Sequence, residues 1–366
     1  MNYPSIILTL FTLVAPIYSN AATVIEHRLP VGPFASRAIF STIDDSHQHA
    51  TVILLPGSGA QGPEEQMAAA STLDNQDHSI FAAFSAALNA GGVNTLALGK
   101  PGVEYFTSWD PSLRFYDKNL YKNLVWEDLI KNARAAIDYV LTLPETDPSR
   151  IYILGHSEGT SVAVDVAALD PRVKGVVLLG YLGTSMASLL DWQFYRRDIE
   201  FLIATDIDSN QDRAVDRAEA ALWPDFVWNW QPGQLAVSFG EIETALRADV
   251  NRKAMYDRTA NSPLYSNGIF TRDDMFTKTA QLTQDVFAIN GELDMQTPAR
   301  EVRELEAKCL AVNKKNCTVT TVQGVGHCFS APRPPRQQPL ADMTMGPVSP
   351  DFQSTLTELA VKIATP

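Results

Sequence analysis

Short apolar runs alternate along the chain with segments whose apolar residues recur every three or four positions, and this alternation limits the folds available to the protein. Runs rich in β-branched residues are expected to be buried strands; they are residues 51–57, 93–99, 150–157, 173–181, 285–291 and 317–324. Helical patterns lie between and after them; they are residues 79–90, 124–143, 159–168, 298–311 and 352–363. Such alternation predicts an α/β fold, with a mostly parallel central sheet and helices on both faces.

The segment 183–282 interrupts this alternation between two expected strands. It is rich in aromatic residues, as in "DWQFYRRDIEF" and "LWPDFVWNW", and its pattern is mainly helical. We expect a cap inserted into a core that is formed by residues 22–182 and 283–366. Since α/β proteins keep their sites outside the carboxyl ends of the strands, the cap should cover that edge of the sheet. Most of its aromatic residues are expected to be cap core.

The N-terminus, "MNYPSIILTLFTLVAPIYSNAA", carries no charged side chain before Glu26. Residues 6–14 are apolar but too few to span a bilayer, and the small residues at 19–21 suit a cleavage site. We predict that residues 1–21 are a signal peptide and that the mature protein is exported, to the periplasm or the extracellular medium. A buried N-terminal strand and a membrane anchor are the alternatives. No later segment is long and apolar enough to cross a membrane, so no membrane partner is expected after cleavage.

The composition and net charge of the chain limit the kinds of binding partner that can be expected. The 366-residue chain is 45% hydrophobic, which is ample for a large buried core. Its formal net charge is −13, and its Lys and Arg residues form no block. Because a negative surface repels phosphates, we expect neither nucleic acid nor an anionic membrane surface as a partner.

The segment "ILGHSEGTS" carries the strongest chemical signal in the chain. An apolar strand runs into Gly155-His156-Ser157-Glu158-Gly159, and a helix-forming stretch follows. A serine on a tight strand-to-helix turn has its hydroxyl raised above the sheet, and glycines two residues to either side relieve the crowding. The five-residue pattern also occurs by chance in loops, so its meaning comes from the flanking strand and helix. We predict that Ser157 is a nucleophile.

A serine nucleophile needs a base, and the base needs an acid that orients it. Asp294 lies just past one expected strand, in "AINGELDMQTP", and His327 lies just past the next, in "VQGVGHCF". The order Ser157, Asp294, His327, with each partner on a loop after a strand, is that of α/β-hydrolases. Glu292 is the competing acid. Without a catalytic role, Asp294 would be a turn or helix-cap residue and His327 a buried loop histidine.

Backbone N–H groups are expected to stabilise the oxyanion that forms during the reaction. The N–H of Glu158, at the helix N-terminus below the nucleophile, is one predicted donor. The loop "PGSGAQGP" should supply the second, because its glycines let the backbone turn toward the nucleophile. Ser58 is the predicted donor from this loop, with Gly59 as the alternative.

Four segments resemble the serine-aminopeptidase/dienelactone-hydrolase-like branch of the α/β-hydrolase superfamily, which contains many exported bacterial esterases. They are the Gly-Ser-Gly-x-Gln loop, "GHSEG", "NGELDMQTP", and "GVGH" with "PVSPDF" before the last helix. The resemblance covers most of the chain and implies the triad Ser157, Asp294 and His327, acting on an ester, thioester or amide. The family's Asp-Lys-Arg-Gly-type loop is replaced here by "LGKPGVEYF", a difference that concerns substrate contacts near residues 100–104.

Three functions fit these residues. The first is an exported serine hydrolase that cleaves a carboxylic ester or thioester through an acyl-enzyme and needs no cofactor for catalysis. Its partner would be a small ester or acyl compound. The second is a serine peptidase or aminopeptidase with the same triad. The third is a non-catalytic, calcium-dependent binding protein on a hydrolase scaffold. The motifs indicate the reaction class and say nothing about the leaving group.

Cys309 and Cys317 enclose "CLAVNKKNC", at the junction of an expected helix and strand. In an oxidising compartment the two can pair, and closing so short a loop would stabilise the fold by about 2.5 kcal/mol. Cys328 is left over. Its position beside His327 would suit a cysteine nucleophile, but Ser157 already fills that role, so Cys328 is expected to be a bystander.

Residues 208–219, "DSNQDRAVDRAE", resemble an EF-hand calcium loop. Such a loop takes oxygen ligands from its first, third, fifth, seventh, ninth and twelfth positions. Those positions are occupied by Asp208, Asn210, Asp212, the carbonyl of Ala214, Asp216 and Glu219. Arg213 is unfavourable, because the sixth position prefers glycine and a positive charge repels the ion. We predict weak, structural calcium binding, with helical stretches at 186–204 and 216–227 flanking the loop. The alternative is a solvated acidic helix–turn–helix of the cap.

Overall fold

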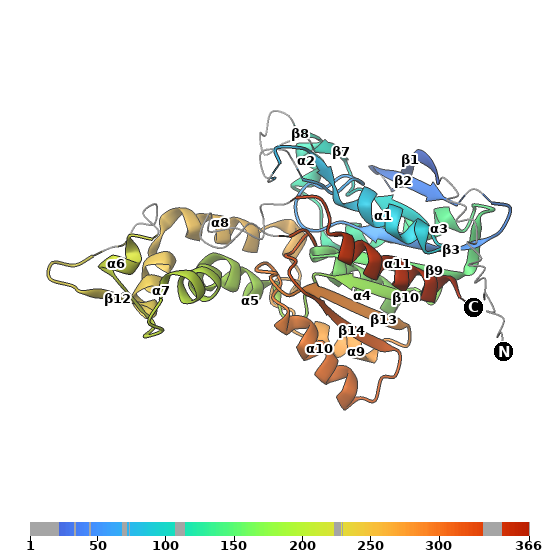
Figure 1. Ribbon diagram of the computed structural model, residues 1–366. Helices are drawn as coiled ribbons and strands as arrows, with labels where there is room; N and C mark the ends of the chain where they lie inside the picture. The colour runs from blue at the N-terminus through green and yellow to red at the C-terminus, as the bar shows by residue number, and fades with distance from the viewer. Residues whose placement is uncertain are drawn as a thin grey trace, which may run out of the picture.

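The computed structural model (Figure 1) describes most of the chain beyond residue 21. The described residues are 22–32, 34–43, 45–67, 72, 74–106, 114–222, 228, 230–331 and 346–365. The predicted signal peptide, residues 1–21, lies outside them. Within the described ranges, no helix combines the length and the apolar character needed to span a membrane.

An eight-stranded sheet forms the centre of the structure, in the order β1-β2-β6-β3-β9-β10-β13-β14. Its strands are β1 (Thr23–Val31), β2 (Phe34–Thr42), β3 (His49–Leu55), β6 (Asn94–Leu98), β9 (Thr146–His156), β10 (Val173–Leu179), β13 (Asp285–Gly291) and β14 (Cys317–Val322). The β1–β2 and β2–β6 pairs are antiparallel, and every other neighbouring pair is parallel. The six predicted strands are all present and form the parallel part of the sheet.

Helices cover both faces of this sheet, as predicted (Figure 1). They are α1 (Ile80–Ala90), α3 (Trp126–Val140), α4 (Glu158–Leu169), α10 (Arg300–Ala311) and α11 (Pro350–Ala364). Successive side chains of a strand point to opposite faces. Ile53 of β3 therefore joins the hydrophobic cluster of α3, α4 and α10, whereas its neighbour Val52 joins that of α1 and α11. In the second cluster, Phe84 packs edge-to-face against Phe352, with 5.4 Å between ring centroids.

Strands β1 and β2 were not among the predicted elements. Most side chains of β1 are exposed, and its sequence, "TVIEHRLPV", lacks the continuous apolar run of a buried strand. β1 lies at the edge of the sheet and pairs only with β2. Shorter elements connect the core strands; they are β4 (Gln66–Met67), β5 (His78–Ser79), β7 (Val103–Phe106), β8 (Arg114–Tyr116) and α2 (Lys118–Tyr121).

Residues 183–282 are mainly helical, and in Figure 1 α5 to α8 extend from the sheet as an arm. Their elements are α5 (Met186–Asp191), the π-helical η3 (Trp192–Arg196) and η4 (Ile199–Ile207), β11 (Ala214–Asp216), α6 (Arg217–Ala220), β12 (Ala236–Ser238), α7 (Phe239–Ala248), α8 (Val250–Ala260), the 3-10 helix η5 (Pro263–Tyr265) and α9 (Met275–Gln281). The arm has its own hydrophobic cluster, which includes Ile203, Val215, Val237 and Phe239. Met275 of α9 belongs instead to the main cluster beside the sheet.

Candidate active site

Ser157 occupies the turn between β9 and α4, in a backbone conformation that a non-glycine residue rarely adopts. Its φ is 54° and its ψ is −120°, which indicates local strain maintained by the surrounding structure. The two flanking glycines are required by close contacts. A Cβ atom on Gly155 would lie 2.2 Å from the carbonyl oxygen of Gly159, and one on Gly159 would lie 2.3 Å from that of Leu55. The strand–turn–helix context predicted for this segment is thus present.

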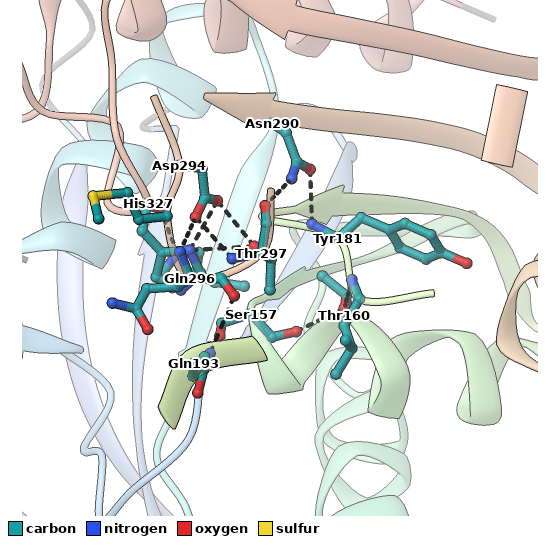
Figure 2. A network of polar contacts seen from close by, with 12 residues as sticks. Ser157, Thr160, Tyr181, Gln193, Asn290, Asp294, Gln296, Thr297 and His327 are labelled. Carbon is teal, nitrogen blue, oxygen red and sulfur yellow. Dashed lines mark hydrogen bonds and ion pairs between the residues drawn. The ribbon is translucent and has the colours of Figure 1, made fainter. Parts of the chain in front are cut away.

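Asp294 lies on the loop after β13 and His327 on the loop after β14, and their side chains are hydrogen-bonded to each other (Figure 2). Nδ1 of His327 is 2.9 Å from Oδ2 of Asp294. The carboxylate is fully buried and accepts three further hydrogen bonds, from the backbone N–H groups of Gln296 and Thr297 and from the Thr297 hydroxyl. These donors fix the orientation of the carboxylate, and the carboxylate in turn favours the tautomer of His327 with its proton on Nδ1.

The three candidate catalytic residues follow β9, β13 and β14 in the parallel part of the sheet, where β10 lies between β9 and β13. The ring of His327 packs against the turn after β10, where a Cβ atom on Gly180 would be 3.1 Å from the His327 Cε1. The backbone N–H of Ser157 donates to the carbonyl of Leu179 at the end of the same strand. No hydrogen bond joins Ser157 directly to His327 in the described part of the chain. In free enzymes such a bond commonly tightens only when the substrate is bound.

Polar side chains of Thr160 and Asn290 support this arrangement (Figure 2). The Thr160 hydroxyl donates to the carbonyl of Ser157, at 2.6 Å. Asn290, which is fully buried on β13, accepts from the N–H of Tyr181 and donates to the carbonyl of Thr297. Asn290 thus ties the loop of Asp294 to the turn after β10. Threonine and asparagine at these positions carry no sequence signal, because their partners are distant in the chain.

The cap reaches the loop that carries Asp294. Trp192 Nε1 donates to the carbonyl of Met295 at 3.0 Å, and Gln193 Nε2 donates to the carbonyl of Gln296 at 3.1 Å. Arg197 donates to the side-chain oxygen of Gln296 at 2.7 Å. These three donors come from η3 and the residue that follows it. The position of the cap and the position of the candidate acid are consequently linked.

The two predicted oxyanion donors are both available. In the described part of the chain, neither the backbone N–H of Ser58 nor that of Glu158 has an acceptor. Gly57, beside Ser58, lies against the nucleophile, since a Cβ atom on it would be 3.1 Å from the Cβ of Ser157. The N–H of Gly57 is already bonded to Oε1 of Glu65, at 2.7 Å. Unpaired N–H groups next to a serine hydroxyl can stabilise a developing negative charge.

The side chain of Glu158 is buried and paired, although it follows the nucleophile directly. Its Oε1 accepts from the ammonium of Lys100 at 2.6 Å, and both side chains are almost fully buried. Its Oε2 accepts from the hydroxyl of Tyr265, which lies in the cap. The backbone N–H of Lys100 also donates to the carbonyl of Gln61 in the expected oxyanion loop. Lys100 belongs to the segment "LGKPG" that departs from the family pattern, and here it is a buried ion-pair partner.

The pairing of Asp294 with His327 involves neither Glu292 nor a cysteine. Glu292 is exposed and accepts from the N–H of Gly324, and no hydrogen bond joins it to His327 in the described part of the chain. Cys309 and Cys317 form a disulfide, with their Cα atoms 6.5 Å apart. Cys328 is buried and lies outside this disulfide. Within the described residues, the acid next to His327 is therefore Asp294.

A polar pocket of about 470 Å³ lies between α5 and α10. It is lined by Thr184, Ala187, Ser188, Asp191, Arg196, Arg300 and Glu301. Burial raises the pKa of Glu301. Its Oε2 accepts hydrogen bonds from the backbone N–H groups of Gly183 and Thr184. The three candidate catalytic residues do not line this pocket, so it is separate from the predicted chemistry.

The predicted calcium loop is a compact turn whose acidic side chains accept backbone hydrogen bonds. Asp208 accepts from the N–H groups of Asp212 and Arg213, and Asp212 accepts from that of Ala214. Arg213 has a φ of 63°, and its guanidinium carbon lies 5.1 Å from the centre of the Phe239 ring. The sixth position thus adopts the left-handed conformation that favours glycine, with its charge directed at an aromatic face.

The acidic side chains in the C-terminal half of the loop also accept hydrogen bonds from within the loop and from α6. Asp216 caps α6 by accepting from the N–H groups of Ala218 and Glu219, and Glu219 accepts from the N–H and hydroxyl of Ser209. α6 ends at Ala220, and residues 223–227 of the predicted exit helix lie outside the described residues. No group of three or more His, Cys, Asp or Glu side chains in the described ranges is arranged to hold a metal ion. Calcium binding stays a prediction.

Comparison with known proteins agrees with this fold. The profile of the Alpha/beta hydrolase family matches residues 52–337. No curated protein matches the sequence. Among solved structures, carboxyl esterase 2 from the mycorrhizal fungus Tuber melanosporum is 12% identical with a TM-score of 0.50, over 97% of this chain and 89% of that chain. An esterase from Pyrobaculum calidifontis is 13% identical with a TM-score of 0.50, over 94% of this chain and 86% of that chain.

A third structure belongs to a longer protein. A candidate dipeptidyl aminopeptidase IV from Bacteroides ovatus ATCC 8483 is 10% identical with a TM-score of 0.52. The match covers 94% of this chain but only 36% of that chain. At such identities the solved structures establish the fold alone. The family profile spans more than half of the sequence, and the sheet order and the turn at Ser157 agree with it. The chain therefore belongs to the alpha/beta hydrolase family.

Proposed function

We propose that this protein is an exported serine hydrolase that cleaves a carboxylic ester or thioester through an acyl-enzyme. The observation that carries the proposal is the pairing of Asp294 with His327. The carboxylate is fully buried, accepts three hydrogen bonds besides that of the imidazole, and lies 2.9 Å from Nδ1. A carboxylate held this firmly leaves Nε2 of His327 as the unprotonated ring nitrogen, which is the form required of a general base.

In the proposed reaction, the Ser157 oxygen attacks the carbonyl carbon while Nε2 of His327 takes the hydroxyl proton. The tetrahedral intermediate collapses, and His327 returns the proton to the departing alcohol or thiol. A water molecule then attacks the acyl-serine by the same route and releases the acid. Asp294 stays ionised throughout and stabilises the imidazolium that forms transiently on His327.

The oxyanion of each tetrahedral intermediate is assigned to the backbone N–H groups of Ser58 and Glu158. Both groups lack an acceptor in the described part of the chain. Glu158 directly follows the nucleophile, and Ser58 directly follows Gly57, on which a Cβ atom would be 3.1 Å from the Cβ of Ser157. One such donor typically contributes about 10²–10³ in rate. The neighbouring N–H of Gly57 is a poorer candidate, because Glu65 already accepts its hydrogen bond.

The proposed chemistry uses no cofactor, and the proposed substrate is a small ester or acyl compound. The substrate class is tested by assaying the purified protein on matched panels of aryl esters, thioesters and aminoacyl amides. We expect hydrolysis of the esters and thioesters, with much slower turnover of amides of similar shape. Amide rates equal to the ester rates would favour the peptidase function instead. No turnover of any panel, together with no labelling of Ser157 by a fluorophosphonate, would contradict a serine hydrolase.

A further inference from the structure

A second histidine lies directly behind the candidate base. The ring of His156 is buried between Glu65 and the backbone of His327. Its Nδ1 is 2.9 Å from Oε1 of Glu65, and its Nε2 is 3.0 Å from the carbonyl oxygen of His327. The rings of His156 and His327 also pack on each other, with centroids 4.9 Å apart and planes tilted by 37°. His156 therefore contacts the residue that the proposed mechanism uses as its base.

Both ring nitrogens of His156 face acceptors. A carbonyl oxygen can only accept a hydrogen bond, and an ionised carboxylate can only accept as well. A neutral imidazole carries one N–H group and can satisfy only one of them, whereas the imidazolium carries two. The geometry is thus that of a protonated ring paired with the Glu65 carboxylate.

The electrostatic surroundings agree with this protonation state. Burial is the largest single influence and lowers the pKa of His156, but the Glu65 carboxylate, the hydrogen bond to the His327 carbonyl and the charge of Asp294 together raise the pKa above its ordinary value. Asp294, on the loop after β13, acts in the same direction. Among the described residues, the rings that pack against His156 are the titratable imidazole of His327 and the apolar rings of Phe84 and Phe329.

Glu65 is buried about as completely as His156. Its side chain is about 4% exposed, and its backbone φ of 42° is strained for a residue other than glycine, so surrounding contacts must maintain it. Oε1 accepts from both His156 and the N–H of Gly57, while Oε2 is buried with no hydrogen-bond partner among the described residues. An ionised carboxylate buried this completely requires a compensating charge. His156, with Nδ1 2.9 Å from Oε1, can supply it when protonated.

We propose that Glu65 and His156 form a buried ion pair that positions the reacting groups. The pair joins three loops at one point: Gly57 in the loop of the expected oxyanion donor, His156 next to the nucleophile, and the backbone of His327. Neither residue touches the reacting atoms in this assignment, so both are positioning residues. The catalytic consequence rests on the proposed function, but the ion pair itself does not.

The protonation state is tested first, by the ring ¹⁵N NMR signals of the full protein labelled at histidine. At pH 7 we expect one buried histidine with both ring nitrogens protonated, and its signals should vanish in His156→Gln. In Glu65→Gln, which keeps the side-chain shape and removes the charge, the same histidine should become neutral. A neutral His156 in the parent protein at pH 7 would overturn the ion pair.

The positioning role is tested by ester kinetics of Glu65→Gln. Because misplacement by about 1 Å can reduce a rate by about 10²-fold, we expect kcat to fall by about 10- to 100-fold, with KM changed less than about 2-fold. Glu64→Gln is the matched control in the same loop; Glu64 pairs with Arg37 at 2.8 Å and should leave kcat unchanged. Glu65→Asp, which retains the charge, should recover part of the loss. A Glu65→Gln protein with the parent kcat would refute the positioning role.

The two tests also separate this inference from the proposed function. A parent protein that hydrolyses no ester but shows a doubly protonated His156 would contradict the proposed function and support the ion pair. A protein that hydrolyses esters and shows a neutral His156 would do the reverse.

Discussion

The Oδ2 atom of Asp294 lies 2.9 Å from Nδ1 of His327, although 33 residues separate the two in the chain. Two neighbouring parallel strands, β13 and β14, bring them together, because each residue follows the carboxyl end of its strand. Parallel strands joined by crossover helices place all their carboxyl ends at one edge of the sheet. The same edge carries Ser157 after β9, so the fold itself accounts for the meeting of these three residues.

Replacing Asp294 by Asn should reduce kcat by about 10⁴-fold with little change in KM. The amide can turn an N–H group toward Nδ1, which favours the tautomer whose Nε2 is protonated and unable to accept the serine proton. Steady-state kinetics on an aryl ester measure the effect. Glu292→Gln is the control, because Glu292 is the exposed acid two residues earlier. Equal losses in the two variants would remove the special role assigned to Asp294.

Replacing Lys100 by Met should lower the free energy of unfolding by about 3–5 kcal/mol, because it leaves the buried carboxylate of Glu158 without its ammonium partner. Urea denaturation measures this change. The double variant Lys100→Met with Glu158→Gln should recover part of the loss, since the uncompensated charge is then also removed. A double variant less stable than Lys100→Met alone would show that the ion pair is not the source of the effect.

Removing the Tyr265 hydroxyl should have a smaller effect on stability. Tyr265→Phe deletes one hydrogen bond to the Glu158 carboxylate, and such bonds to charged groups contribute about 1.5–3 kcal/mol. The ring and its packing near Trp126, at 6.4 Å between centroids, are retained. Since Tyr265 lies in the cap, thermal unfolding and ester kinetics should both respond. An unchanged melting temperature would show that the hydrogen bond from the Tyr265 hydroxyl to Glu158 does not stabilise the fold.

Stability should depend on pH through His156. The pKa of His156 is raised in the folded protein above the ordinary value of 6.5, so the folded state binds the proton more tightly than the unfolded state. The stabilisation that comes from this tighter proton binding is fully present below pH 6.5, and it is lost as the pH rises through the pKa of His156 in the folded protein. Urea denaturation across that range should show the decline in the parent protein and a flatter profile in His156→Gln. The exposed His47, changed to Gln as a control, should retain the parent profile.

Calcium at millimolar concentration should raise the melting temperature if residues 208–219 bind the ion. A dissociation constant of roughly 10⁻⁴–10⁻³ M would stabilise the protein by on the order of 1 kcal/mol. Asp208→Ala combined with Glu219→Gln should abolish the shift, and magnesium should not reproduce it. A parent protein whose melting temperature ignores calcium would identify the loop as a solvated turn held by its own backbone hydrogen bonds.

The parallel core and the candidate triad could be predicted because their signals are local. A strand followed by Gly155-His156-Ser157-Glu158-Gly159 and a helix is a continuous pattern, and Asp294 and His327 each follow a recognisable strand. The edge strand β1 escaped prediction because most of its side chains are exposed, so its sequence has no continuous apolar run.

The supporting residues could not be predicted, because their roles arise from contacts between distant segments. Tyr265 and Glu158 are 107 residues apart, and Glu65 and His156 are 91 residues apart. The sequence around each of these four residues gives no sign of a partner so far away in the chain. The same applies to Trp192 of the cap, whose indole N–H donates to the loop of Asp294. Buried polar pairs of this kind are specified by the packed fold as a whole.

The central claim is that Ser157 is the nucleophile of an ester hydrolase, and the rate of Ser157→Ala on a short-chain aryl ester tests it most directly. We predict that kcat falls by at least about 10⁴-fold while the far-ultraviolet spectrum and melting temperature remain those of the parent protein, since triad members act as a unit. Cys328→Ala, a change beside His327 that spares the triad, should retain most of the activity. A Ser157→Ala protein that keeps the parent rate, together with an inactive Cys328→Ala protein, would contradict the account.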